Sequence, residues 1–542
     1  MSTRSALAAF VPSGDYRLVA PAVTVWVVTV VGVLAPGVIV AVAAISGAVL
    51  VGAVVVVWRG VVTWSTVAVG MVVAAMAVIA ACGLVLRLDT RARHPLSHID
   101  GKARAVLVVR DDPVAMEPAA SARVRVRVDV GAVAGRPCAA ASAMLSGPAA
   151  QWSELLPGQR VSALVRVGPP RRGELLVARL TAADAPHLLG RPPPQQRLAG
   201  AVRDRLQEVS ARALGPDAAG LLPGLVLGDV STLDRGVRDD FRAAGLSHLT
   251  AVSGANFSLV VGAVVLGVRM LGASPRLTAL LGAVVLIGFV ILVRPSPSVL
   301  RAAMMGMIGL LALVGARRSV ALPALGGATI VGLLWWPELA VAPGFALSVL
   351  ATTGLVLWSA GLRDWLRGKR IPAGLAELTA MALAAQLVTA PVVAMLSGRF
   401  SVVGLLANIL VVPVVGVIGI VGTAAAVIAS IGGADGTGAA VGVLMLRALG
   451  PEMWWMIGCA RVLGGASWAS VPVPGGAIGA VVVGVCTIVV VGLVWQHGRR
   501  DGTSAPPARR RRLLDRSGDL GGRRGTVDVD GHRRAGHPGP RG

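Results

Sequence analysis

The sequence has 542 residues, of which 55% are hydrophobic and only 14% are charged. This composition excludes a soluble enzyme and is typical of a protein that crosses a membrane many times. The formal net charge of +24 favours a polyanionic partner such as nucleic acid. A codon bias toward arginine together with the positive-inside rule is the alternative explanation, because lysine occurs only as Lys102 and Lys369.

About twelve apolar runs come close to the roughly 20 residues that cross about 30 Å of hydrocarbon, which predicts a polytopic α-helical membrane protein. The first run is interpreted as an anchor because no signal-peptide cleavage pattern follows it, and the fourth, tenth and eleventh are candidates for broken or re-entrant segments. The runs lie near residues 18–34, 37–58, 61–86, 246–271, 277–293, 297–315, 319–336, 342–360, 373–396, 401–430, 436–460 and 474–495.

Arginine-rich exits from the even-numbered runs predict the orientation. Arg317 and Arg318 follow the sixth run, "RDWLRGKR" (363–370) follows the eighth, and the tail from Arg499 follows the twelfth, so these exits face the cytoplasm. The same parity places the N-terminus inside and the polar insert after the third run outside. We expect five parts: N-terminal helices (1–87), an extracytoplasmic β domain (88–197), an amphipathic or re-entrant segment (198–244), a transmembrane channel domain (245–496) and a disordered tail that binds anionic membrane lipid (497–542).

The polar insert carries strand patterns. In "SARVRVRVDV" (121–130) valines alternate with arginines, and shorter patterns at 104–109, 160–168 and 174–180 predict further strands of a small β-barrel that is similar to an oligonucleotide-binding fold. Its arginine stripe is either a DNA contact or a solvated sheet face. Trp152 is the only aromatic residue of the insert, which weakens a DNA-stacking role.

The next segment contains an amphipathic helix and an unexplained acid. Val202 and Leu206 recur at helical spacing while Arg203 is expected to point away from that face, so the helix is predicted to lie along the membrane surface. Further on, Ser231 with Asp234 fits a capping box that begins a charged helix. Asp229 has no such local explanation.

Polar side chains then recur inside apolar runs. In "GLSHLTAVSGANFSLVVG" (245–262), His248, Ser253 and Asn256 span about 140° of a helix, which predicts a wet face. Gly254 allows the helix to unwind or another part of the chain to approach closely.

Arg301 lies within a later run, where an arginine costs roughly 2.5–3.5 kcal/mol. It is therefore expected to face the bundle interior, a wet cavity or an acidic partner, with Asp229 and Asp240 as candidates, or else to snorkel to the interface. Gln386 and Asn408 each precede a proline by five residues, and such a proline frees a backbone carbonyl. Simple helix–helix hydrogen bonding is the alternative role for these amides.

Five stretches taken in order resemble the competence domain of the ComEC family, the membrane channels of DNA uptake in naturally transformable bacteria. They are "LLPGLVLGD" (221–229), "GLSHLTAVSG" (245–254), "SPSVLRA" (296–302), "GFALSVLATTGL" (344–355) and "LANILVVPVVG" (406–416). The resemblance implies a channel for single-stranded DNA in the cytoplasmic membrane. It also implies an external DNA receptor and a cytoplasmic ATPase or helicase as partners, since the sequence has no P-loop.

Two features depart from the family pattern. Ala255 and Asn256 stand where the family often has Leu-His. The seven histidines include no HxHxDH cluster of the kind that a metallo-β-lactamase-like nuclease needs, and no CxxC is present, so neither a metal nor another cofactor is expected and a separate nuclease would be required. The alternatives to a channel are a secondary transporter of an anionic solute and a membrane scaffold without transport activity.

Overall fold

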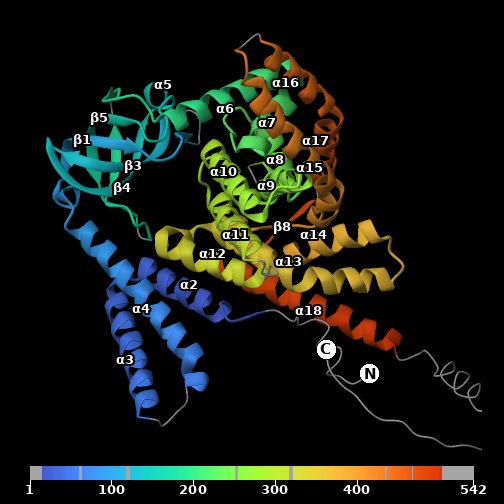
Figure 1. The fold of residues 1–542 in the computed structure, drawn as a ribbon, viewed down its shortest axis with the longest axis horizontal. Coiled ribbons are helices and arrows are strands. Elements are labelled where there is room, and N and C mark those ends of the chain that lie inside the picture. Colours follow the sequence, from blue (N-terminus) through green and yellow to red (C-terminus); the bar gives the residue numbers. More distant parts are fainter. Residues whose placement is uncertain are drawn as a thin grey trace, which may run out of the picture. The chain divides into compact units, whose positions relative to one another are not determined.

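The computed structural model describes residues 15–59, 64–116, 123–171, 173–182, 184–250, 254–315, 321–433, 436–466 and 468–502. The predicted site residue Ser253, the loop arginines Arg317 and Arg318, and the tail from residue 503 onward lie outside these ranges. The chain divides into two compact units after Val483. The first unit contains the N-terminal helices, the β domain and most of the apolar helices (Figure 1).

The N-terminal helices pack on the later part of the same unit. Helix α2 (Val19–Leu34) is followed by a 3-10 turn, η1 (Pro36–Val38), and by the adjacent helices α3 (Ile39–Trp58) and α4 (Trp64–Ala92) (Figure 1). The indole N–H of Trp26 on α2 donates to the carbonyl oxygen of Ala340 at 3.0 Å, and the Trp26 ring lies 5.4 Å from that of Phe345. The first apolar helix is thereby fixed to a segment more than 300 residues later in the chain.

A closed five-stranded β-barrel follows, in the order β1-β3-β4-β6-β5 with β5 pairing back to β1. The buried valines of β3 alternate with exposed or half-buried arginines as predicted, because successive side chains of a strand point to opposite faces, while Asp129 farther along the strand is also buried. The strand predicted at 174–180 begins only at Arg179. The strands are β1 (Gly101–Val109), β2 (Val114–Ala115), β3 (Arg123–Val133), β4 (Arg136–Pro148), β5 (Arg160–Gly168), β6 (Arg179–Ala182) and β7 (His187–Leu188), with η2 (Pro95–His98) before them and helix α5 (Ala149–Trp152) after β4.

Helices make up the rest of the described chain. They are α6 (Pro194–Ala213), α7 (Pro216–Leu227), α8 (Arg235–Ala243), η4 (Ser247–Leu249), α9 (Gly254–Met270), α10 (Pro275–Val293), α11 (Pro297–Val314), α12 (Ala321–Trp335), η5 (Pro337–Val341), α13 (Pro343–Gly368), α14 (Ala373–Ser397), α15 (Gly404–Ala429), α16 (Thr437–Ala448), α17 (Gly450–Gly464) and α18 (Gly476–Gly502). A short antiparallel pair, β8 (Arg399–Ser401) with β9 (Ser470–Pro472), joins the chain before α15 to the chain before α18.

Within the described ranges, each predicted apolar run coincides largely with a helix or a pair of helices. By length and composition, seven of the described helices can cross a membrane, and six further apolar helices are shorter. The eleventh run is broken at Leu449, where Gly450 and Pro451 begin a new helix, since proline is favoured in a first turn. The tenth run is one continuous helix, α15, despite Pro413.

Helix α6 departs from the predicted surface helix. Val202 and Leu206 are buried as expected, but Arg203 is buried as well, with 9% of its surface exposed, and Leu198 is largely exposed. The apolar face of α6 packs against α7, α10, α15 and α16. Helical spacing alone placed Arg203 on the solvent side because it could not show that partners surround the helix.

Helices α13 and α14 form a closely packed hairpin (Figure 1). A Cβ placed on Gly354 would lie 2.5 Å from the carbonyl oxygen of Ala384 on α14. We therefore expect Gly354→Ala to lower the free energy of unfolding by about 1–3 kcal/mol, because the two backbones must separate. Gly344→Ala on the same helix is the control, since nothing lies within 4 Å of its added Cβ. Equal stability of the two variants in denaturant titrations would contradict this packing.

Candidate functional site

The beginning of α9 is the place where the motif stretches meet. Asn256 is 4% exposed, and its Nδ2 donates to the carbonyl oxygen of Leu225 on α7 at 3.2 Å. A Cβ on Gly419 of α15 would lie 3.4 Å from the Asn256 amide carbon. Asn256 therefore lies in a closely packed junction of α7, α9 and α15 rather than on a wet face.

Close backbone approaches tighten the same junction. A Cβ on Gly224 of α7 would lie 2.6 Å from the carbonyl oxygen of Thr250, and one on Gly245 would lie 3.1 Å from the Cα of Gly404 at the start of α15. Gly245 also has a φ of 75°, a conformation that glycine adopts without strain. These glycines let the segment 245–250 pass between α7 and α15.

Arg301 joins two more of the stretches to this junction. It is 7% exposed on α11, its Nε donates to Oγ of Ser348 on α13 at 2.7 Å, and its Nη1 lies 3.1 Å from Sδ of Met305. A Cβ on Gly254 would lie 2.7 Å from Nη2 of Arg301, so the missing side chain of Gly254 makes room for the guanidinium. Of the two positions that the sequence left open for Arg301, this burial agrees with the bundle interior and not with snorkelling to the interface.

The predicted acidic partners of Arg301 are engaged elsewhere. Asp229 pairs with Arg203 at 3.6 Å, and Asp240 pairs with Arg461 at 3.7 Å. Within the described ranges Arg301 forms no ion pair, which corrects the sequence-based pairing. Sequence spacing could not resolve this competition, because the other arginines reach the same carboxylates from α6 and α17.

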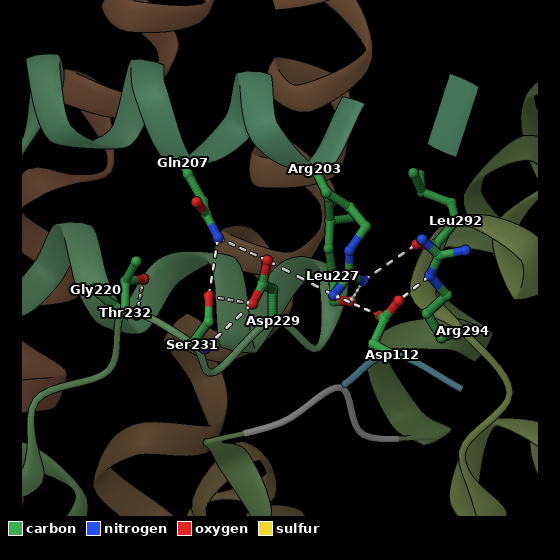
Figure 2. A network of polar contacts seen from close by, with 10 residues as sticks. All are labelled: Asp112, Arg203, Gln207, Gly220, Leu227, Asp229, Ser231, Thr232, Leu292 and Arg294. Atoms are coloured by element: carbon green, nitrogen blue, oxygen red, sulfur yellow. Dashed lines mark hydrogen bonds and ion pairs between the residues drawn. The ribbon is translucent and has the colours of Figure 1, made fainter. Parts of the chain in front are cut away.

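Asp229 belongs to a network that the sequence did not predict (Figure 2). Nη2 of Arg203 lies 3.3 Å from Oδ2 of Asp112 in the β domain and 3.6 Å from Oδ2 of Asp229. Arg294, directly after α10, donates from Nε to the same Asp112 oxygen at 3.2 Å. Burial lowers the pKa of the Arg294 guanidinium, and the Asp112 carboxylate opposes that shift. The Asp112 carboxylate thus bridges the β domain to two arginines of the helical part.

Arg203 also donates hydrogen bonds to backbone carbonyls at the C-terminal ends of two helices. Its Nη1 donates to the carbonyl oxygens of Leu227 at 2.8 Å and of Leu292 at 3.3 Å, in the last turns of α7 and α10 (Figure 2). Carbonyls at helix C-termini have no partner within the helix and carry partial negative charge, so a buried guanidinium stabilises both ends. The position of Arg203 in the middle of a helix did not indicate in the sequence that it would bind the C-terminal ends of two other helices.

The prediction that Ser231 and Asp234 form a capping box at the start of α8 is wrong. Asp234 itself is the N-cap, and its Oδ2 accepts from the backbone N–H groups of Gly236 and Val237. Ser231 instead donates from Oγ to Oδ1 of Asp229 at 2.7 Å, and Gln207 Nε2 donates to Oδ2 of Asp229 at 2.7 Å (Figure 2). Asp229 therefore accepts hydrogen bonds from Ser231 and Gln207 in addition to its ion pair with Arg203.

The side chains of the remaining candidate residues take no part in the contacts described above. His248 is exposed on η4. Asn408 on α15 donates to the carbonyl oxygen of Gly404 within its own helix at 2.8 Å. Gln386 on α14 has a buried Oε1 that accepts no hydrogen bond from the described part of the chain. Two cavities, of about 130 and 380 Å³, are lined by other residues, so neither marks a path beside the candidates.

Comparison with known proteins agrees with the resemblance found in the sequence. Residues 225–498 match the family described as "Competence protein". ComE operon protein 3 of Bacillus subtilis (strain 168) is 28% identical over 200 residues, which cover 37% of this chain and 25% of that protein, so the match spans about a quarter of its length. No solved structure matches the chain. The family match covers all five motif stretches except the first four residues of 221–229, and the chain is a multi-pass membrane protein of the competence protein family.

Proposed function

We propose that this protein carries single-stranded DNA across the cytoplasmic membrane of a bacterium during natural transformation. The observation that supports this most is the convergence of motif stretches that are far apart in sequence: four of the five meet at the start of α9, and the fifth, 406–416, reaches the same helix where Gly416 lies beside Leu259. Gly224 approaches Thr250, Gly254 approaches Arg301, and Arg301 donates to Ser348, so the stretches 221–229, 245–254, 296–302 and 344–355 are each represented in these contacts. A membrane scaffold would need no such focus of polar groups and glycines at one place among its helices.

The same proposal assigns roles to the other parts of the protein. Strand passage needs an external DNA receptor, a cytoplasmic ATPase or helicase that pulls the strand, and a separate nuclease that removes the second strand. The β domain is proposed to lie on the extracytoplasmic side of the membrane. Trp152 has no exposed surface and donates from Nε1 to the carbonyl oxygen of Asp184, so the domain's only aromatic side chain is not available for base stacking.

Deletion of the gene tests the proposal in a transformable host that has no second copy. Fluorescent DNA should still bind the cell surface, while protection of the label from external nuclease and entry into the cytoplasm should be lost. Complementation with the intact gene should restore entry. Normal transformation of the deletion strain would contradict the proposal, and loss of surface binding would show that the protein acts at an earlier step.

A further inference from the structure

The guanidinium of Arg301 is a buried cation whose described partners are all neutral. It contacts a hydroxyl at Ser348 and a thioether at Met305, and no carboxylate of the described residues lies within ion-pair distance. The other buried arginines, Arg203 and Arg294, each have a carboxylate partner. Among the described residues Arg301 therefore differs from them in having no counter-charge.

A buried, unpaired cation is costly. Removing a charge from water costs several kcal/mol unless an opposite charge and further hydrogen bonds compensate. In membrane segments such residues face a bundle interior and mark the paths of ions or substrates. Two neutral acceptors compensate only in part, because they bring no opposite charge to offset the lost hydration of the guanidinium. An anion would therefore compensate the guanidinium better than the hydroxyl of Ser348 and the thioether of Met305 do.

The surroundings of Arg301 fit an anionic oxygen. Helix α9 begins at Gly254, directly beside Nη2, and the first N–H groups of a helix stabilise negative charge. Because Gly254 has no side chain, the guanidinium and the first turn of α9 can act on the same group. Arginine also presents its N–H donors as a planar fork that matches two phosphate oxygens.

We infer that Arg301 and the first turn of α9 form a binding site for one phosphodiester group of the strand, an inference that rests on the proposed function. In this site a phosphate oxygen replaces the Ser348 hydroxyl and the Met305 sulfur as acceptor of the Arg301 N–H groups. The site recognises the backbone and not the bases, so binding is independent of sequence. Because the strand must move on, a single phosphate site is more suitable than a row of tight ones.

Binding of oligo(dT) to the full-length protein in lipid nanodiscs tests this inference, with Arg301→Gln as the main variant. We expect the variant to bind the strand about tenfold more weakly, and the slope of log affinity against log salt concentration to fall by about one, as for the loss of one phosphate contact. An otherwise identical strand with uncharged methylphosphonate linkages should bind both proteins equally. Arg269→Gln, an exposed arginine in the last turn of α9, is the matched control and should leave the affinity within twofold.

Two further variants keep the test valid if Arg301→Gln folds poorly. Arg301→Lys keeps the charge but loses the fork, so it should retain the salt slope with weaker binding. Gly254→Ala should displace the guanidinium and weaken binding of the charged strand only. Unchanged affinity and salt slope in all three Arg301 and Gly254 variants would overturn the inference. If the deletion strain takes up DNA normally while Arg301 still governs phosphate binding in nanodiscs, the proposed function fails and the anion site stands.

Discussion

Replacing Arg203 by alanine is expected to lower the free energy of unfolding by about 3–5 kcal/mol, the range for removing one partner of a buried ion pair. The guanidinium has two carboxylate partners, Asp112 and Asp229, and two helix-end carbonyls, and only 10% of its side chain is exposed. Its loss would leave both carboxylates without their shared cation. Unfolding in mixed detergent micelles, followed by tryptophan fluorescence, measures the change.

Arg212→Ala on the same helix is the matched control. Arg212 pairs with Glu208 at the surface, with 45% of its side chain exposed, so its removal should cost less than about 1 kcal/mol. If both variants lose the same small amount, the network of Figure 2 does not hold the β domain to the helical part.

Replacing Trp152 by alanine is expected to destabilise the β-barrel by about 3–5 kcal/mol, as for other buried aromatic residues. The indole has no exposed surface, and a Cβ on Gly147 of β4 would lie 2.7 Å from its Cδ1. The change removes the largest side chain of the barrel core together with the hydrogen bond to Asp184. Hydrogen exchange of the β3 amides in the full-length protein should become at least about a hundredfold faster.

Leu164→Ala on β5 is the control for this experiment, because Leu164 is 40% exposed and surface changes of this kind usually stay within about 0.5 kcal/mol. Protection of β3 that survives the loss of Trp152 would show that the barrel does not depend on this side chain.

Periodicity predicted the elements whose environment is uniform along their length. Long apolar runs gave the positions of the membrane-length helices, and the valines of β3 alternated because one face of the barrel is buried throughout. The strand β4 was missed because its centre, "AAASA", has small side chains with low strand propensity, and only pairing with β3 and β6 makes it a strand. Propensity gives no information on such partners.

The contacts of the candidate site were harder to predict because they depend on competition between distant residues. The sequence left Arg301 either in the bundle interior or at the interface, and its candidate partners Asp229 and Asp240 are bound by Arg203 and Arg461. Asp112 is one of two adjacent acids in the loop between β1 and β2, and nothing in its neighbourhood indicated that it would join Arg203 to Arg294. None of these residues lies near its partner in the sequence.

The most direct measurement of the central claim is photocrosslinking during uptake. A photoreactive amino acid replaces His248, which is exposed within the motif stretch 245–254, and labelled DNA is stalled in transit by a bulky group at its trailing end. A second protein carries the same probe at Ile287, which is 52% exposed on α10. We predict a DNA adduct at position 248 and none at position 287. An adduct at 287 without one at 248 would show that the strand does not pass the junction at the start of α9.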